Sequence, residues 1–299
     1  MMVQGHSESS RQQDGKPTTA AGMDPLTQDS LLSLNRRFYE QAAQHFDATR
    51  QSWTPGLRAI LPYFRTAGKE RLSVLDVGCG NGRFARLLEE AGISASYTGV
   101  DGSRSLLRLA REATAGLEGV ECEFTEADLA EAGWARVLRK DGGVENCCMR
   151  GTGEVSETPR FSVVLCTATV HHLPGYALRL RLMRDLLHLS AGYVILSFWQ
   201  FLSSERLRSK LIDPGTVGIS ATDLEPGDGL LPWRQGIRSV RYVHQVDEAE
   251  LRQLASDSGQ TVLHTFRADG KETDLNLYAV LGRAESDSGK YRARSTVED

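Results

Sequence analysis

A glycine-rich turn carries the residue types that can bind a small polar ligand. Gly78, Gly80 and Gly82 follow an apolar run and precede a helical pattern, with Cys79 inside the turn. Glycine adopts backbone angles closed to other residues and lets a ligand approach the main chain closely. A dinucleotide-binding loop has the spacing G-x-G-x-x-G, but Arg83 occupies its third glycine position. The turn therefore disfavours a nicotinamide dinucleotide as the ligand.

Carboxylates stand at the ends of three consecutive strand-like segments. Asp76 precedes the glycine turn by two residues, Asp101 closes the next segment ahead of Gly102, and Asp128 closes the third ahead of Leu129. In an open α/β sheet the ligand binds beyond the carboxyl ends of the strands, where these groups would meet. Each residue taken singly could be only a turn or a helix cap. Their order within alternating strands and helices favours a ligand site.

The glycine turn with its preceding acid resembles the motif of class I S-adenosylmethionine (SAM)-dependent methyltransferases. The resemblance implies SAM as the cofactor, with Asp76 and the turn facing the ammonium and carboxylate of its methionine part. Asp101 would accept both ribose hydroxyls in charge-assisted hydrogen bonds. Asp128 would accept the adenine amino group, and Leu129 would lie beside the adenine ring.

Two adjacent histidines follow the fourth strand-like segment, in the sequence "TATVHHLP". In the methyltransferase fold the end of this strand faces the transferred methyl group. His171 and His172 could bind the acceptor, take a proton near neutral pH, or cap the next helix. Because adjacent side chains rarely point the same way, we favour His171.

An amphipathic helix is predicted near the N-terminus, in "FYEQAAQHFDATRQSW", and would lie over the cofactor cleft as a cap. Tyr39 and Arg50 could contact the methionine end of the cofactor. The alternative is that Tyr39, Phe46 and Trp53 only pack against the rest of the protein.

Aromatic and basic residues gather in a predicted loop region at 227–246. Such a set can stack on a base and pair with a phosphate or carboxylate. The alternative is a solvated basic loop whose tryptophan is anchored in the core. The residues concerned are Trp233, Arg234, Arg238, Arg241 and His244.

The strand–helix alternation predicts an α/β fold. We expect a Rossmann-like, seven-stranded, mostly parallel sheet with an antiparallel last strand, helices on both faces and the N-terminal helical cap. The methyltransferase domain would span 27–284, with a surface insertion at 141–160 and substrate-side loops at 200–246. Residues 1–26 and 285–299 are too poor in large apolar groups to order themselves and are predicted to be disordered tails.

Composition narrows the classes of partner. The formal net charge of −4 makes the whole molecule a poor electrostatic match for nucleic acid, so a polyanion site would have to be local. None of the five cysteines forms a C-x-x-C pair, and we expect no metal site. No apolar run approaches the roughly 18–20 residues of a membrane span. With no signal-peptide pattern either, we expect a cytoplasmic protein that does not bind membranes.

The chain more closely resembles the tRNA wobble-uridine carboxymethyl methyltransferases, over residues 31–283. The segments that carry this resemblance are "FYEQAAQHFDATRQSW", "LDVGCGNGRF", "GVDGSRSLL", "VHHLP" and "LPW…RYVHQVDEAEL". The resemblance implies that SAM methylates the carboxylate of 5-carboxymethyluridine in the anticodon loop of tRNA, with tRNA and a small zinc-bearing activator protein as partners. It implies further that Arg241 and His244 lie beside the acceptor. The insertion at 141–160 departs from the family pattern.

The nature of the acceptor decides which residues the reaction needs. A carboxylate is already ionised at neutral pH, so the enzyme would need a cationic clamp and no general base. A hydroxyl or amine acceptor would instead require a histidine to take a proton. The sequence leaves open a small-molecule O- or N-methyltransferase and, as a second alternative, a non-catalytic scaffold with this fold.

Overall fold

The structure is a computed structural model that describes residues 22–65, 71–138 and 160–282. The predicted tails at 1–26 and 285–299 and the insertion at 141–160 lie outside these ranges, apart from residues 22–26 and 160. None of the helices in the described ranges has the length and apolar character of a membrane-spanning segment.

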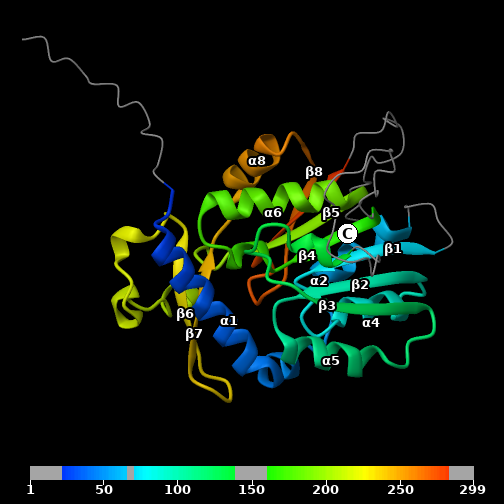
Figure 1. Cartoon of the computed structure of the whole chain (residues 1–299), viewed down its shortest axis with the longest axis horizontal. Coiled ribbons are helices and arrows are strands. Elements are labelled where there is room, and N and C mark those ends of the chain that lie inside the picture. Colours follow the sequence, from blue (N-terminus) through cyan, green and yellow to red (C-terminus); the bar gives the residue numbers. More distant parts are fainter. Residues whose placement is uncertain (1–21, 66–70, 139–159, 283–299) are drawn as a thin grey trace, which may run out of the picture.

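Seven strands form one sheet in the order β3-β2-β1-β4-β5-β9-β8, and β6 and β7 form a separate hairpin (Figure 1). All neighbours among the first five strands pair in parallel, whereas β9 pairs antiparallel with both β5 and β8. The predicted fold is confirmed, with β9 as the antiparallel strand. The strands are β1 (Leu72–Val77), β2 (Ala95–Asp101), β3 (Val120–Glu126), β4 (Phe161–Thr167), β5 (Ser190–Trp199), β6 (Asp228–Trp233), β7 (Ser239–His244), β8 (Val262–Ala268) and β9 (Asn276–Gly282).

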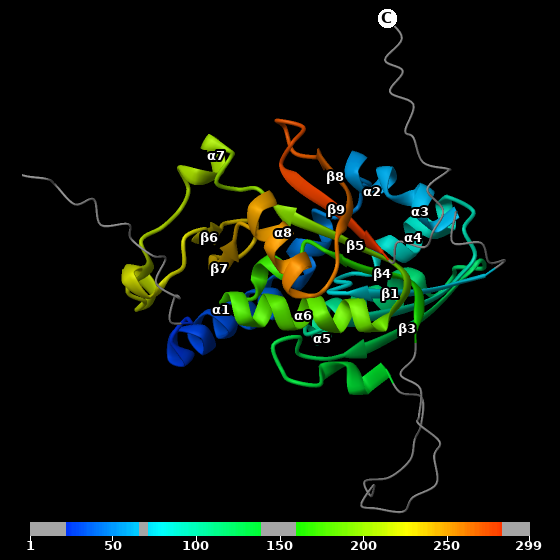
Figure 2. The ribbon, with the colours of Figure 1, turned by 90° about the horizontal axis from the view of Figure 1, so that it is seen from above.

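Helices cover both faces of the sheet, as Figure 2 shows. The α-helices are α1 (Pro25–Ala48), α2 (Pro55–Ala59), α3 (Leu61–Arg65), α4 (Arg83–Glu90), α5 (Arg104–Thr114), α6 (Tyr176–Leu189), α7 (Glu205–Arg208) and α8 (Glu248–Asp257). Short 3-10 turns are η1 (Trp134–Leu138), η2 (Val170–His172), η3 (Pro214–Val217) and η4 (Ala221–Asp223).

Two apolar cores sandwich the sheet. Because side chains alternate along a strand, Leu75 and Val77 of β1 join the core under α6 and α8, whereas Val74 joins the core under α2, α3 and α4. Asp76 shares the face of Val74. The Asp76 carboxylate therefore lies buried near the C-terminal end of β1, within an otherwise apolar layer.

The loop region predicted at 200–246 contains a hairpin that the sequence pattern did not reveal. Strands β6 and β7 pair antiparallel from Asp228↔His244 to Trp233↔Ser239. Gly229 and Pro232 lie inside β6, and both residue types weigh against a strand in a sequence pattern. After Asp128 the described residues form the short 3-10 helix η1.

Helix α1 is joined to this hairpin through one buried amide. The Asn35 side chain accepts a hydrogen bond from the Tyr242 backbone N–H at 2.8 Å and donates to the Tyr242 carbonyl at 3.1 Å. The same amide donates to the His172 carbonyl at 3.2 Å. Figure 1 shows α1 lying alongside β6 and β7. Asn35 thus fastens the predicted cap helix to two other segments of the chain.

We expect Asn35→Leu to lower the free energy of unfolding by about 2–3 kcal/mol, because the buried Tyr242 N–H loses its partner. Gln44→Leu, on the exposed side of α1, is the matched control and should change it by less than about 0.5 kcal/mol. Urea unfolding followed by circular dichroism measures both. Equal effects of the two substitutions would contradict this role of Asn35.

Candidate active site

A cavity of about 940 Å³ opens at the carboxyl ends of β1, β2 and β4, beneath α1 and beside the turn between β8 and β9. It brings together most of the residues that the sequence singled out. Those that line it are Tyr39, Arg50, Asp76, Gly78, Cys79, Gly80, Asp101, Gly102, Asp128, Leu129, His171, His172 and Arg241. Gly82 and His244 are not among the lining residues.

The three glycines of the turn have different functions, although all have positive φ. A Cβ on Gly78 would lie 2.1 Å from Thr169 Oγ1, so Gly78 allows the turn to pack against the end of β4. A Cβ on Gly80 would meet only Phe46, at 4.0 Å, and would otherwise enter the cavity. Gly82 stands before α4 and packs against α5 and β3. Gly80 is therefore the glycine that leaves room for a ligand.

Asp76 has one carboxylate oxygen without a partner. Its Oδ2 accepts a hydrogen bond from the Tyr97 hydroxyl at 2.5 Å, whereas its buried Oδ1 has no partner among the described residues. Burial raises the pKa of Asp76 to about 7. An unpartnered buried oxygen costs free energy unless a ligand supplies a donor. A cationic group of the ligand would satisfy this oxygen and favour its ionised form.

Asp101 is held by the glycine turn and by the next helix. Its Oδ2 accepts the Gly80 N–H and its Oδ1 accepts the Ser103 N–H, both at 2.9 Å. Burial raises the pKa of Asp101 despite these bonds. Each carboxylate oxygen has a second lone pair, so both can still accept hydroxyl donors from a ligand in the cavity.

Asp128 lies at the cavity but is already engaged. Its Oδ2 forms an ion pair with Arg36 of α1 at 2.7 Å, and its Oδ1 accepts the Ala130 N–H. The predicted contact with an adenine amino group would therefore have to share these oxygens. Leu129 lines the cavity beside it.

Two arginines supply positive charge near the glycine turn. Arg50 lies over the Phe46 ring, 4.6 Å from its centroid, and burial lowers the pKa of Arg50 to about 10, so it stays cationic at neutral pH. Arg83 also lines the cavity, close enough to Asp76 to affect its pKa. Sequence reasoning used Arg83 only to exclude a dinucleotide loop. Its position directly after the turn was the signal that could have identified it.

The opposite wall carries Arg241 beside the hydrogen-bonded pair of Tyr39 and His172. The Arg241 guanidinium lies 4.7 Å from the Trp199 ring centroid, and its buried Nε has no partner among the described residues. Burial raises the pKa of Tyr39, although Arg241 lies close enough to oppose this shift, and the Tyr39 hydroxyl lies 2.6 Å from His172 Nε2. Tyr39, a residue of α1, therefore forms part of this wall.

Both histidines are neutral, and their ring protons are assigned from the hydrogen bonds around them. His172 Nδ1 donates to the Tyr242 carbonyl at 3.1 Å, so its Nε2 accepts from Tyr39. Burial and the nearby Arg241 lower the pKa of His172 to about 3. His171 Nδ1 accepts the Trp199 N–H at 3.4 Å, which leaves the proton on Nε2, and burial lowers its pKa as well.

The structure corrects the placement of His244 and of its basic neighbours. His244 lies behind the cavity wall, between Asp228 and Glu250, and does not reach the acceptor side. Trp233 is buried against Phe38 of α1, at 5.5 Å between ring centroids. The arginines at 234 and 238 are exposed near the turn of the hairpin. Arg241 alone of the predicted basic set reaches the cavity, because strand residues alternate between faces.

Comparison with protein families decides the class of the chain. A family model described as a methyltransferase domain matches residues 44–265. The chain belongs to this methyltransferase family. Comparison with curated proteins gives no match.

Solved structures share the fold of this methyltransferase at low identity. One is a SAM-dependent methyltransferase from Methanosarcina mazei, 18% identical with a TM-score of 0.53, covering 74% of this chain and 96% of that one. Another is the magnesium protoporphyrin IX methyltransferase of Synechocystis with bound S-adenosylhomocysteine, also 18% identical with a TM-score of 0.53, covering 83% and 98%. A third, from Clostridium acetobutylicum, is a SAM-dependent methyltransferase, 11% identical with a TM-score of 0.55, covering 82% and 98%.

The cavity of the methyltransferase fits SAM as its cofactor. The unpartnered Asp76 oxygen suits the ammonium group, and the free lone pairs of Asp101 suit the ribose hydroxyls. Arg50 and Arg83 provide cations for the carboxylate of the methionine part. The open space over Gly80 leaves room for the part of SAM that connects these groups.

Cofactor affinity should rise with pH around neutrality. The raised pKa of about 7 leaves Asp76 half protonated at pH 7, and only its ionised form attracts an ammonium group. The affinity for S-adenosylhomocysteine, measured by calorimetry, should therefore increase about tenfold from pH 6 to pH 8 and then level off. Asp76→Asn should bind more weakly and without this slope. The same slope in the variant would assign the titration to another group.

Proposed function

We propose that this SAM-dependent methyltransferase transfers its methyl group to a carboxylate oxygen, giving a methyl ester. The observation that carries the proposal is Arg241, a cation in the cavity wall with a buried Nε that no described residue satisfies. A buried cation of this kind favours an anionic group of the bound acceptor. Guanidinium matches the planar geometry of a carboxylate, which it can hold in two parallel hydrogen bonds.

The hydrogen-bond pattern of the two histidines supports an acceptor that is ionised before it binds. His172 Nε2 is already occupied by the Tyr39 hydroxyl, and His171 Nδ1 by the Trp199 N–H. Neither ring therefore presents a free basic nitrogen to a hydroxyl or amine acceptor. A carboxylate needs none, since its reference pKa near 4 leaves it nucleophilic at neutral pH.

The residues of the cavity would act by placing the acceptor. SAM supplies an electrophilic methyl group on a sulfonium. Arg241 would fix the carboxylate, and the stacked Trp199 ring would restrict the position of the guanidinium. The Tyr39–His172 pair lies beside the same guanidinium in the cavity wall. Alignment of two bound reactants is itself a large part of catalysis in such a displacement.

The first candidate acceptor is the carboxymethyl group of a tRNA wobble uridine, which the sequence resemblance implies. A planar base could stack on the aromatic groups of this wall, which include Tyr39 and Trp199. A small zinc-bearing activator protein would then be a partner, supplying contacts to tRNA that the acidic chain lacks.

The second candidate is a small-molecule carboxylate. Two of the arginines that line the cavity are paired with carboxylates, Arg36 with Asp128 at 2.7 Å and Arg104 with Glu126 at 2.6 Å. Paired surface charges attract a polyanion weakly, because its binding depends on unneutralised cations that release counterions. This observation favours a single carboxylate over a nucleic acid.

Methyl esters can be recognised by their lability to base. The purified protein is incubated with methyl-labelled SAM and, separately, with bulk tRNA or a small-metabolite extract. The products are then treated with alkali. We expect the label to be released as volatile methanol from one of the two fractions, which also identifies the acceptor class. Label that stays non-volatile after alkali would indicate an ether or an N-methyl product and would overturn the carboxylate proposal.

Substitutions of Arg241 and His171 distinguish a cationic clamp from a general base. Arg241→Met should lower kcat/KM by about 10- to 100-fold, the loss of a charge-assisted hydrogen bond worth roughly 1.5–3 kcal/mol. His171→Gln should cost well under the roughly 100-fold that loss of a general base brings. Arg252→Met, on the exposed face of α8, is the matched control and should retain full activity. An inactive His171→Gln beside an active Arg241→Met would reverse the assignment.

A further inference from the structure

Strand β7 presents Arg241 to the cavity and a polar network to the other side. Side chains alternate along a strand, so Tyr242 and His244 share the face opposite to Arg241 that points away from the cavity. Tyr242 donates its hydroxyl proton to Asp228 Oδ1 at 2.6 Å. Asp228 is the cross-strand neighbour of His244 in β6. The network therefore lies directly behind the wall that carries the proposed acceptor clamp.

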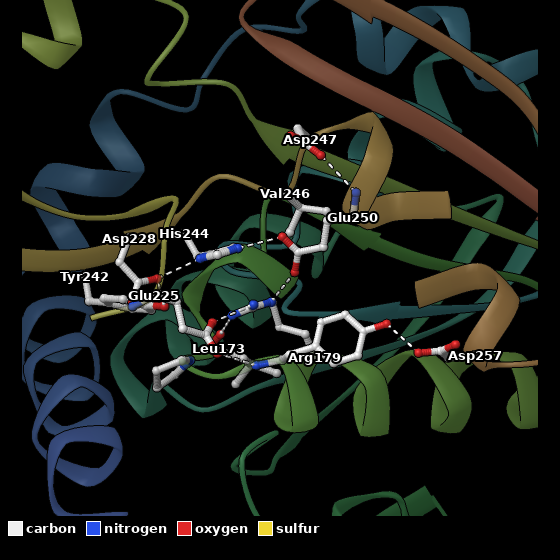
Figure 3. A network of polar contacts seen from close by, with 12 residues as sticks. Leu173, Arg179, Glu225, Asp228, Tyr242, His244, Val246, Asp247, Glu250 and Asp257 are labelled. Carbon is white, nitrogen blue, oxygen red and sulfur yellow. Dashed lines mark hydrogen bonds and ion pairs between the residues drawn. The ribbon is translucent and has the colours of Figure 1, made fainter. Parts of the chain in front are cut away.

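His244 is the cation at the centre of this network (Figure 3). Its Nδ1 lies 2.7 Å from Asp228 Oδ1, and its Nε2 lies 2.7 Å from Glu250 Oε2 of α8. Carboxylates only accept hydrogen bonds, so both ring nitrogens must donate and the ring is an imidazolium. Burial opposes the charge, but the bonds to Asp228 and Glu250 raise the pKa of His244 overall.

Arg179 of α6 extends the network to the histidine turn of the active site. Its Nε donates to Glu250 Oε1 and its Nη2 to Glu225 Oε2, both at 2.8 Å. Its Nη1 donates to the Leu173 carbonyl at 3.2 Å, directly after His171 and His172 (Figure 3). The Arg179 side chain is only 2% exposed, and each of its three guanidinium nitrogens has a hydrogen-bond partner among the described residues.

The same network thus fixes two separate walls of the cavity. On one side it holds β7, whose Tyr242 carbonyl receives the His172 ring. On the other side it holds the backbone of the turn that carries that ring. A displacement of either wall would therefore change the position of the Tyr39–His172 pair relative to Arg241.

We propose that His244 and Arg179 are positioning residues. They hold Arg241 and the His172 ring in place relative to one another and do not touch the acceptor. The proposal rests on the proposed function only in taking Arg241 as the acceptor clamp. The network acts through two buried, fully bonded cations, and loss of one partner leaves its neighbours as uncompensated buried charges.

The same atoms offer a possible metal site, which the geometry disfavours. Glu225, Asp228 and His244 each present a ligand atom within 4.8 Å of the others. All three side chains already have hydrogen-bonded partners: Arg179, Tyr242 and Glu250. A metal ion would have to displace a proton from His244 and compete with Arg179. The network is complete without an ion.

The test reads the His172 ring directly by ¹⁵N–¹H NMR of the full chain with S-adenosylhomocysteine bound. His172→Gln assigns the signal. In the wild type this ring should show one fixed tautomer, protonated on Nδ1. In His244→Gln that signature should be lost, while affinity for S-adenosylhomocysteine stays within about twofold, because the cofactor side does not share the network. Tyr176→Phe removes only the exposed bond to Asp257 and is the matched control.

Glu250→Gln, which keeps the side-chain shape, replaces His244→Gln as the test variant if the latter does not fold. Once an acceptor is known, His244→Gln should lower kcat/KM in the wild-type background and have little further effect in Arg241→Met. Non-additive losses of kcat/KM in the double variant would show that His244 acts through Arg241, whereas a purely structural role would give additive losses. An unchanged His172 signature, or a parallel loss of cofactor affinity, would overturn the proposal. So would a Zn²⁺-dependent rise in Tm that His244→Gln abolishes.

Because the NMR signature needs no acceptor, the two proposals can fail independently. Loss of the fixed tautomer together with a base-stable product would leave the positioning role intact and remove the carboxylate acceptor. A methyl ester product together with an unaltered His172 tautomer in His244→Gln would support the carboxylate acceptor and remove the positioning role.

Discussion

The acceptor side of this methyltransferase depends on the main-chain N–H and C=O groups of Tyr242. Its N–H donates to Asn35 Oδ1, and its carbonyl accepts from both Asn35 Nδ2 and His172 Nδ1. One backbone unit thereby joins α1, the turn after β4 and strand β7, which are far apart in sequence. Without this junction the sheet could still form, since its strands pair independently of α1. The cavity would then lack the wall that carries Arg241.

Burial shifts the pKa values of ionisable groups in both halves of the cavity. On the cofactor side it raises the pKa values of Asp76 and Asp101, which favours their neutral forms until a cation or donor arrives. On the acceptor side it lowers the pKa values of His171 and His172, which removes positive charge from everything there except the arginine. A zwitterionic cofactor with a cationic centre and an anionic acceptor complement these halves. The pKa shifts of the cavity residues thus agree with the proposed methyl transfer from a sulfonium to an anionic acceptor.

The cofactor half could be predicted from the sequence because it is local. Asp76, the glycine turn and Asp101 belong to two successive strands, and strand–turn–helix geometry brings them together whatever the rest of the chain does. The acceptor half is assembled by tertiary contacts, so the sequence suggested its residue types but not their positions. Arg241 and His244 were expected together because 227–246 was interpreted as a loop and because the family resemblance implied that both lie beside the acceptor. As residues of a strand three positions apart they face opposite sides, and the strand itself was hidden by the glycine and proline of β6.

Arginine is better suited than lysine to the position that Arg241 holds. Burial lowers the pKa of this group, yet a guanidinium remains protonated where a buried ammonium would readily lose its proton. Its flat face also lies near three aromatic rings, with centroids 4.7 Å away at Trp199, 5.4 Å at Phe38 and 5.5 Å at Trp233. Such contacts stabilise a cation partly removed from water and leave its edge free for a planar anion. The aromatic groups of α1, β5 and β6 therefore stabilise the Arg241 cation, which forms no ion pair with a carboxylate of the described residues.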